Sequence, residues 1–230
     1  MEKMKIQGLQ KMTLLDYPGK IACTVFLGGC NFRCPFCHNG SLALGSGDEL
    51  MSREELLTFL ASRRGRLEGV CVSGGEPTIH EALPELLAEI KALGYAVKLD
   101  TNGTNAEMLL SLINDGLVDY VAMDVKHSPE KYEDSCVINS DLISEIKLSA
   151  KFLMEGRVDF EFRTTMIREM HTEEDIEAIG RWLSGNEKFF LQTYRDEGDL
   201  LVGGFTPHTS EEKETLVNLL KKYIPNAIWR

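Results

Sequence analysis

The stretch IACTVFLGGCNFRCPFCHN, residues 21–39, joins an apolar run to a loop that contains three cysteines. Residues 21–27 predict a buried β-strand, because they are rich in β-branched and aromatic side chains and are followed at once by two glycines. Five further apolar runs end in turn residues and lie at residues 67–72, 96–99, 118–125, 158–166 and 189–193. Stretches with helical spacing of apolar residues separate these runs, so strand and helix alternate along the chain.

This alternation sets the expected fold class. Strand–helix repeats build a parallel sheet with helices outside, and right-handed crossovers curl six such units into most of a barrel. Two helix starts are marked by the capping boxes Ser52-x-x-Glu55 and Thr209-x-x-Glu212. We therefore expect an α/β fold, a partial (β/α)6 barrel, in a single domain over residues 1–230. Its expected parts are an N-terminal segment, a core barrel, and a C-terminal loop and helix, at residues 1–20, 21–200 and 201–230.

Composition limits the partners and the location of the chain. The 230 residues include 25 Lys and Arg against 36 Asp and Glu, and the net charge of −11 argues against binding nucleic acid through a broad basic surface. No apolar run approaches the roughly 18 residues that a membrane span needs, and residues 1–5 lack the apolar stretch of a signal peptide. We expect a cytoplasmic protein with reduced thiols, so its six cysteines need an explanation other than disulfides.

Three of the cysteines, Cys30, Cys34 and Cys37, form a C-x3-C-x2-C run directly after the first predicted strand. Three thiolates on one short loop can hold a [4Fe–4S] cluster, and three ligands for four irons leave one iron open. The alternative is a zinc site with His38 as the fourth ligand. The spacing favours the cluster, because adjacent residues such as Cys37 and His38 are poorly placed to share one tetrahedron.

Glycines and an acid follow the second predicted strand, at the end where parallel α/β folds place their chemistry. Gly74 and Gly75 precede Glu76, within SGGEP at residues 73–77. Two glycines allow the backbone to approach a ligand closely. A plain strand-to-helix turn is the alternative.

Charged residues follow the third and fourth predicted strands. Asp100 ends the third, and Asp124 and Lys126 end the fourth. Buried strand ends rarely carry unpaired charges, so these side chains indicate a polar ligand or a cation, or else an ion pair between Lys126 and one of the acids. Arg163 lies within the fifth strand and either points into the barrel or faces outward beside an acid.

These motifs together resemble those of the radical S-adenosylmethionine (SAM) enzymes. The combination that carries the resemblance is C-x3-C-x-aromatic-C after the first strand and GGEP after the second. Residues 9–20 (LQKMTLLDYPGK) and 29–39 (GCNFRCPFCHN) resemble segments of the activating proteins for anaerobic ribonucleoside-triphosphate reductase. Residues 100–103 (DTNG) and 124–126 (DVK) are similar to motifs of glycyl-radical activating enzymes generally.

The resemblance implies a role for each matching residue. Cys30, Cys34 and Cys37 would hold the [4Fe–4S] cluster, and Phe36 would lie near the adenine of SAM. The other matching residues would bind SAM or a monovalent cation beside it. Gly74, Gly75 and Glu76 would hold the methionine amino group, Asp124 would bind the ribose hydroxyls, and Lys126 would bind the methionine carboxylate. Asp100 and Thr101, together with Asp124, would bind the cation. Arg163 matches an arginine of formate-lyase activators and joins the cofactor contacts. No catalytic histidine is predicted, because TYR at residues 193–195 stands where those activators have one.

The implied reaction is the reductive cleavage of SAM, followed by hydrogen abstraction from a glycine of anaerobic ribonucleoside-triphosphate reductase. Flavodoxin or ferredoxin would be the electron donor. Within the same superfamily, the alternatives are an activator of another glycyl-radical enzyme such as pyruvate formate-lyase, and a small-molecule enzyme such as a 7-carboxy-7-deazaguanine synthase. A redox-sensing or zinc-stabilised adaptor without catalysis is the alternative from another class.

The remaining cysteines and histidines are expected to have structural roles. Cys23 and Cys71 lie in or at the end of predicted strands and are interpreted as small core residues. Cys136 follows a charged loop and is interpreted as a bystander. The isolated histidines, interpreted as surface or structural residues, are His80, His127, His171 and His208.

Overall fold

In the part of the chain that the structure describes, eight strands form one sheet whose spatial order follows the sequence. They are β1 (Ile6–Thr13), β2 (Ala22–Leu27), β3 (Gly69–Gly74), β4 (Ala96–Thr101), β5 (Tyr120–Asp124), β6 (Asp159–Met166), β7 (Phe189–Thr193) and β8 (Ile228–Trp229). Strands β2 to β7 are parallel, whereas β1 pairs antiparallel with β2. The computed structural model describes residues 4–136, 139 and 141–230, so residues 1–3 of the expected N-terminal segment lie outside it.

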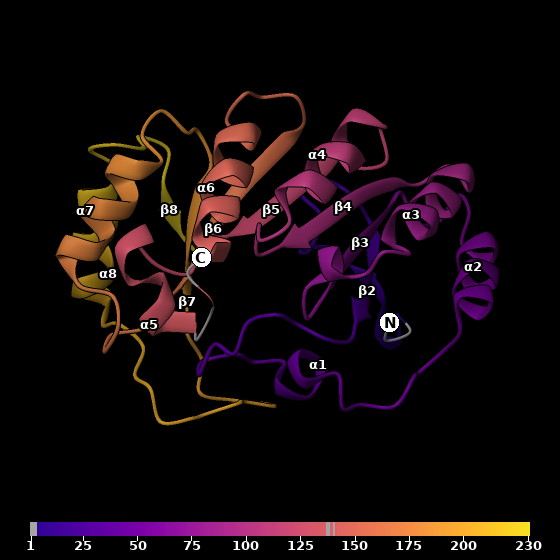
Figure 1. Cartoon of the computed structure of the whole chain (residues 1–230), viewed down its shortest axis with the longest axis horizontal. Coiled ribbons are helices and arrows are strands. Elements are labelled where there is room, and N and C mark those ends of the chain that lie inside the picture. Colours follow the sequence, from indigo (N-terminus) through magenta and orange to yellow (C-terminus); the bar gives the residue numbers. More distant parts are fainter. Residues whose placement is uncertain (1–3, 137–138, 140) are drawn as a thin grey trace.

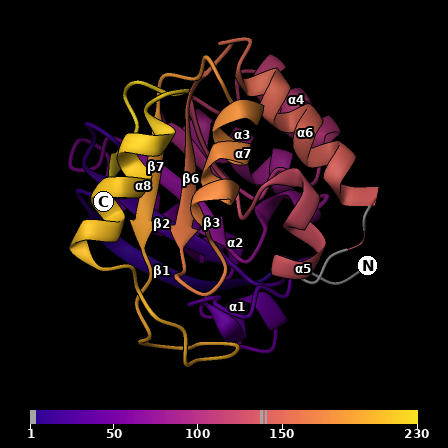
Figure 2. The ribbon, with the colours of Figure 1, turned by 90° about the vertical axis from the view of Figure 1, so that its left-hand side faces the viewer.

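Helices connect the parallel strands, and most of them cover the outer face of the curved sheet, as Figures 1 and 2 show. They are α1 (Gly40–Leu44), α2 (Arg53–Ser62), α3 (Leu83–Ala92), α4 (Ala106–Asn114), α5 (Tyr132–Cys136), α6 (Asp141–Leu153), α7 (Glu173–Trp182) and α8 (Ser210–Leu220). The short helix α1 lies apart from this outer layer, near the carboxyl ends of the strands (Figure 2).

The expected α/β partial barrel is confirmed, and each of the six predicted runs overlaps one of the strands β2 to β7. Two short additions were not predicted. Strand β1 lies in the N-terminal segment. Because Gln10, Lys11 and Met12 are all exposed, its sequence lacks the alternation of apolar and polar residues that is typical of a half-buried strand. Strand β8 has only two residues and pairs with β7. Because β1 and β8 form the two edges of the sheet, the barrel is open between them.

Both predicted capping boxes are present. The Ser52 hydroxyl accepts a hydrogen bond from the Glu55 amide, and the Glu55 carboxylate accepts one from the Ser52 amide. Thr209 and Glu212 start α8 in the same way. A third capping box, between Thr172 and Asp175, starts α7. It was not predicted, because the usual capping box has Glu or Gln at the second position.

An aromatic plug closes the amino end of the barrel. The Tyr17 ring is 3% exposed and packs with Ala22 and Tyr120, and its centroid lies 6.0 Å from that of the Tyr120 ring. Gly69, at the start of β3, makes room for it, since a Cβ there would lie 2.9 Å from the Tyr17 ring. Asp16 joins the plug to β2 by accepting a hydrogen bond from the Thr24 hydroxyl. The LLDYPG segment is therefore a structural element at the amino end.

The structure also bears on the cysteines and on the helices as membrane spans. All six cysteines are free thiols. None of the helices in the described part of the chain is both long enough and apolar enough to cross a membrane.

Candidate active site

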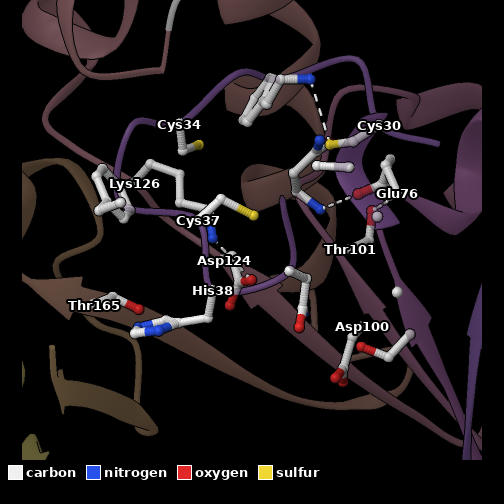
Figure 3. Close-up of a pocket in the computed structure, with 18 of the residues that line it drawn as sticks. Cys30, Cys34, Cys37, His38, Glu76, Asp100, Thr101, Asp124, Lys126 and Thr165 are labelled. Atoms are coloured by element: carbon white, nitrogen blue, oxygen red, sulfur yellow. Dashed lines mark hydrogen bonds and ion pairs between the residues drawn. The ribbon is translucent and has the colours of Figure 1, made fainter. Parts of the chain in front are cut away.

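All twelve predicted site residues line one cavity at the carboxyl ends of the strands. Its volume is about 250 Å³. The predicted residues that line it are Cys30, Cys34, Phe36, Cys37, Gly74, Gly75, Glu76, Asp100, Thr101, Asp124, Lys126 and Arg163. Figure 3 shows the three cysteines along one loop, with Asp100 lying below them in this view. Residues distant in sequence are thus brought together by the parallel strands, whose carboxyl ends share one edge.

The cysteine loop, residues 28–39, is held by its own backbone and by neighbouring segments. The Cys37 amide donates to the Cys34 carbonyl, 3.0 Å away, which turns the chain between these two thiols. The Arg33 amide donates to the Cys136 carbonyl, also 3.0 Å away. A later segment lies against the far end of the loop, where the Val202 amide donates to the Pro35 carbonyl at 2.9 Å.

The side chains of the loop do not converge on a single ion. Among the described residues, no three His, Cys, Asp or Glu side chains are grouped so that they could hold a metal ion. The His38 ring instead lies beside Tyr194, with 5.3 Å between the ring centroids. The position of His38 beside Tyr194 disfavours the zinc alternative, in which His38 is the fourth ligand.

The three thiols differ in their electrostatic surroundings. Burial raises the pKa of Cys30 to about 12 and also raises the pKa of Cys37. A hydrogen bond from the buried Cys136 side chain lowers the pKa of Cys34, and the nearby charge of Lys126 acts in the same direction. Cys136, interpreted from the sequence as a bystander, therefore contacts a predicted cluster ligand. Iron binding requires thiolates, and the contacts with Cys136 and Lys126 both favour the thiolate form of Cys34.

The two predicted glycines let the loop after β3 lie directly against the cysteine loop. A Cβ on Gly74 would clash with the backbone of Leu27, and one on Gly75 would clash with the Gly29 carbonyl oxygen. Gly74 also has a φ of 127°, which side-chain-bearing residues rarely adopt. The Glu76 amide donates to the Gly29 carbonyl at 2.8 Å. Both glycines therefore serve a close approach between two backbones beside the cavity.

Glu76 is 1% exposed and is fixed by hydrogen bonds from three residues. Its Oε1 accepts from the Thr78 amide, the Thr78 hydroxyl and the Thr101 hydroxyl, at 3.0, 2.6 and 2.7 Å. Its Oε2 accepts from the Asn102 amide at 2.6 Å. Burial raises the pKa of Glu76 despite these donors. Thr101, predicted to bind a cation, is thus engaged with Glu76.

The charged strand ends form a connected network at the cavity. Lys126 Nζ lies 3.0 Å from Asp124 Oδ2, so the ion pair considered from the sequence is present. Arg163 points inward: its Nε lies 2.9 Å from Asp124 Oδ1, and its Nη1 lies 3.5 Å from Asp100 Oδ2. Although burial opposes ionisation, Arg163 and Lys126 outweigh it and hold the pKa of Asp124 well below its usual range.

Several residues of the site were missed from the sequence. Asn31 of the cysteine loop donates to the Thr104 hydroxyl at 2.7 Å and accepts from the Asn102 side chain at 2.9 Å, which ties this loop to the end of β4. Asn31 lies inside the cysteine run, but its residue type alone does not indicate this role. Gln192, at the end of β7, also lines the cavity.

Two of the histidines lie behind the cavity and are structural, as interpreted. The His127 and His171 rings are buried and stacked, with centroids 4.9 Å apart. His171 Nδ1 accepts from the Ile167 amide, so its Nε2 donates to the Lys126 carbonyl, 2.9 Å away. Burial lowers the pKa of His171 to about 4, which keeps the ring neutral. His171 thus supports the backbone that carries Lys126.

Comparisons with known proteins agree with this geometry. A protein of Methanocaldococcus jannaschii, provisionally named a glycyl-radical enzyme activating enzyme, is 33% identical over 99% of this chain and 96% of its own length. The 7-carboxy-7-deazaguanine synthase of Neisseria meningitidis is 36% identical over 54% of this chain and 52% of its own length. The structure of Streptococcus suis SuiB bound to S-adenosylmethionine shares the fold, with a TM-score of 0.68 and 15% identity over 88% of this chain and 48% of SuiB.

The family comparison covers the site-bearing strands. The model of the radical SAM superfamily matches residues 24–183, which include the cysteine loop and the strand ends that carry the other predicted site residues. The chain belongs to the radical SAM superfamily.

Proposed function

We propose that this chain is a radical SAM activating enzyme that generates a glycyl radical on an anaerobic ribonucleoside-triphosphate reductase. The observation that carries the activase assignment is the similarity to the M. jannaschii protein over nearly the whole of both chains. The cavity supports it, because it gathers every residue that the family resemblance assigns to the cofactors.

The family implies a [4Fe–4S] cluster and SAM, and the donor set of the cavity fits them. Three thiols face the cavity from one loop, which matches a cluster with one open iron. When bound, the cluster would supply one electron for the reductive cleavage of SAM.

The remaining residues of the cavity bind and orient SAM in this proposal. Lys126 carries a positive charge for the methionine carboxylate, and Asp124 accepts hydrogen bonds from the ribose hydroxyls. The backbone of Gly74 and Gly75, next to the fixed carboxylate of Glu76, receives the methionine ammonium group. Phe36 is buried at the cavity wall, where its ring can pack against the adenine.

The reductase as target is supported by the sequence resemblance of residues 9–20. The structure places the Tyr17 part of this segment at the amino end of the barrel, far along the strands from the cavity. This segment therefore supports the assignment through its resemblance and does not itself line the cavity. Glycine is a suitable target, because it has no side chain to block approach and tolerates unusual backbone angles in an inserted loop.

The decisive experiment mixes reconstituted, reduced protein with SAM and the anaerobic reductase under argon. Electron paramagnetic resonance should show a doublet on the reductase, split by the one hydrogen left on the glycine Cα. A parallel reaction with pyruvate formate-lyase tests the alternative glycyl-radical target, and the Cys34→Ala variant is the matched inactive control.

Each alternative predicts a different result. A doublet on pyruvate formate-lyase alone would reassign the target. Cleavage of SAM without a glycyl radical on either protein would favour a small-molecule substrate, the activity named for the N. meningitidis relative. Failure to develop absorption near 400 nm after anaerobic reconstitution would point to an adaptor without a cluster.

A further inference from the structure

A lysine is buried in the wall of the barrel, beneath the proposed SAM site. Lys98 lies in β4 with its side chain 1% exposed. Its Nζ makes an ion pair with Asp100 Oδ1 and lies 3.8 Å from Cys71 Sγ. Residues 98 and 100 are two positions apart on one strand, so their side chains share a face. Lysine is almost never fully buried unless it is paired, so this residue is expected to have a specific role.

Lys98 begins a chain of alternating charges that ends at the cavity. The order is Lys98, Asp100, Arg163, Asp124 and Lys126, and each member contacts the next. The Lys98 side chain is 1% exposed, whereas those of the other four members are 15% to 28% exposed, so the chain leads from a fully buried lysine to side chains that line the cavity. Three positive side chains face two carboxylates, and each carboxylate oxygen has its own cationic partner.

This arrangement engages the residues expected to bind a monovalent cation. Asp100 gives one oxygen to Lys98 and the other to Arg163, and Asp124 is shared between Arg163 and Lys126. Although burial disfavours the charged form of Asp100, Arg163 and Lys98 outweigh it and lower the pKa of this carboxyl. The Thr101 hydroxyl donates to Glu76. The ammonium group of Lys98 therefore lies where an alkali cation would otherwise neutralise the negative charge of Asp100.

We propose that Lys98 is a built-in counter-cation, which neutralises Asp100, keeps Arg163 on Asp124, and makes SAM binding independent of alkali cations. The inference rests on the proposed role of Asp124 in binding SAM. Lys98 is a positioning residue, because it acts through Arg163 and does not itself reach the cavity. Without its charge, Asp100 would compete with Asp124 for the guanidinium group, since opposite charges attract strongly at low effective dielectric. A small cation could then bind beside Asp100, neutralise its charge and leave Arg163 on Asp124.

The experiment uses the full chain with its cluster reconstituted and oxidised, so that SAM binds without turnover. Dissociation constants for SAM are measured by anaerobic equilibrium dialysis at constant ionic strength in N-methyl-D-glucamine, potassium, sodium or methylammonium chloride. The wild type is compared with Lys98→Met, which keeps the length of the side chain and removes its charge. Lys91→Met is the matched control, because Lys91 Nζ also bridges an aspartate, Asp119, at 2.7 Å but on the protein surface.

The wild type and Lys91→Met should bind SAM with the same dissociation constant, within twofold, in all four salts. Lys98→Met should bind roughly tenfold more weakly in the bulky N-methyl-D-glucamine salt, and potassium, sodium or methylammonium should restore most of the loss. Removing both charges, in Lys98→Met/Asp100→Asn, should abolish the dependence on the cation, because no unpaired carboxylate remains. A purely structural lysine would weaken binding equally in all four salts.

Three results would overturn the inference: a wild type that requires an alkali cation, a Lys98→Met variant that binds SAM normally, or a defect that small cations do not relieve. Melting temperatures in the same salts decide the question even if binding cannot be compared, because small cations should raise the melting temperature of Lys98→Met selectively. Absence of SAM binding by the wild type in every salt would instead refute the proposed function. The melting comparison would then still test the role of Lys98.

Discussion

The two ends of the barrel are built from the same strands but differ in their chemistry. At the amino end, Tyr17 and Tyr120 pack against each other in a buried aromatic plug, and the Tyr120 hydroxyl donates to the buried Glu161 carboxylate. At the carboxyl end, half-buried charges such as Asp100 and Arg163 contact one another around an open cavity. The difference indicates that the amino end contributes stability and the carboxyl end binds ligands. Substitutions at the two ends should therefore affect different measurements.

The largest expected effect is loss of the cluster. Replacing Cys30, Cys34 or Cys37 with alanine should abolish iron and sulfide binding, since each supplies one of only three ligands. Iron content and absorption near 400 nm after reconstitution measure this. The Cys23→Ala and Cys71→Ala variants are the controls and should retain the cluster, because both residues are buried on strands away from the cysteine loop. Equal loss of iron in Cys71→Ala and Cys34→Ala would disprove the ligand assignment.

At the amino end, Tyr17→Ala should lower the free energy of unfolding by about 3 kcal/mol, because it leaves a cavity in the plug. Chemical denaturation measures this loss. The dissociation constant for SAM, measured under native conditions, should stay within twofold of the wild-type value. Tyr17→Phe keeps the ring and is the control for stability. A large loss of SAM affinity in a folded Tyr17→Ala protein would contradict the division between the two ends.

At the carboxyl end, Lys126→Ala should show the reverse pattern. Losing a charged hydrogen bond costs about 1.5–3 kcal/mol, so SAM should bind roughly tenfold to a hundredfold more weakly. The iron content should not change. Lys91→Ala serves as the surface control. Unchanged SAM affinity together with a lower melting temperature would mean that Lys126 serves only its ion pair with Asp124.

The smallest effect is a pH dependence of stability that arises behind the cavity. Burial lowers the pKa of His171 from 6.5 to about 4, so the unfolded chain binds more protons between these two values. Stability should therefore fall as the pH falls, by about 2 kcal/mol between pH 7 and pH 5. Urea unfolding at both pH values measures the change. His171→Gln should show a smaller difference between the two pH values, and an equal difference would assign the dependence to other groups.

The sequence predicted the parallel strands and the members of the cavity well, for a physical reason. Buried strands require apolar runs, and the polar residues that end them necessarily meet at one edge of a parallel sheet. The position of Cys136 beside Cys34 could not be predicted, because it depends on how the loop after β5 folds back. The hydrogen bonds of Asn31 likewise depend on tertiary contacts.

Lys98 is an instructive omission. The sequence indicated an ion pair within the strand, because the lysine in the run AVKLDT shares a face with Asp100 two positions later. Among the charges within the predicted strands, the motifs indicated Arg163 but not Lys98. The direction of Arg163 was open for a related reason, because a side chain within a strand faces inward or outward according to a register that the sequence alone does not determine.

The most direct test of the proposed function is hydrogen transfer from the target glycine. The anaerobic reductase, labelled with deuterium at its glycine Cα positions, is mixed under argon with reduced protein and SAM, and the 5′-deoxyadenosine formed is analysed by mass spectrometry. The account predicts one deuterium in the 5′-deoxyadenosine and collapse of the doublet in the electron paramagnetic resonance spectrum. Cleavage of SAM with no deuterium transferred from any glycine of the reductase would contradict it.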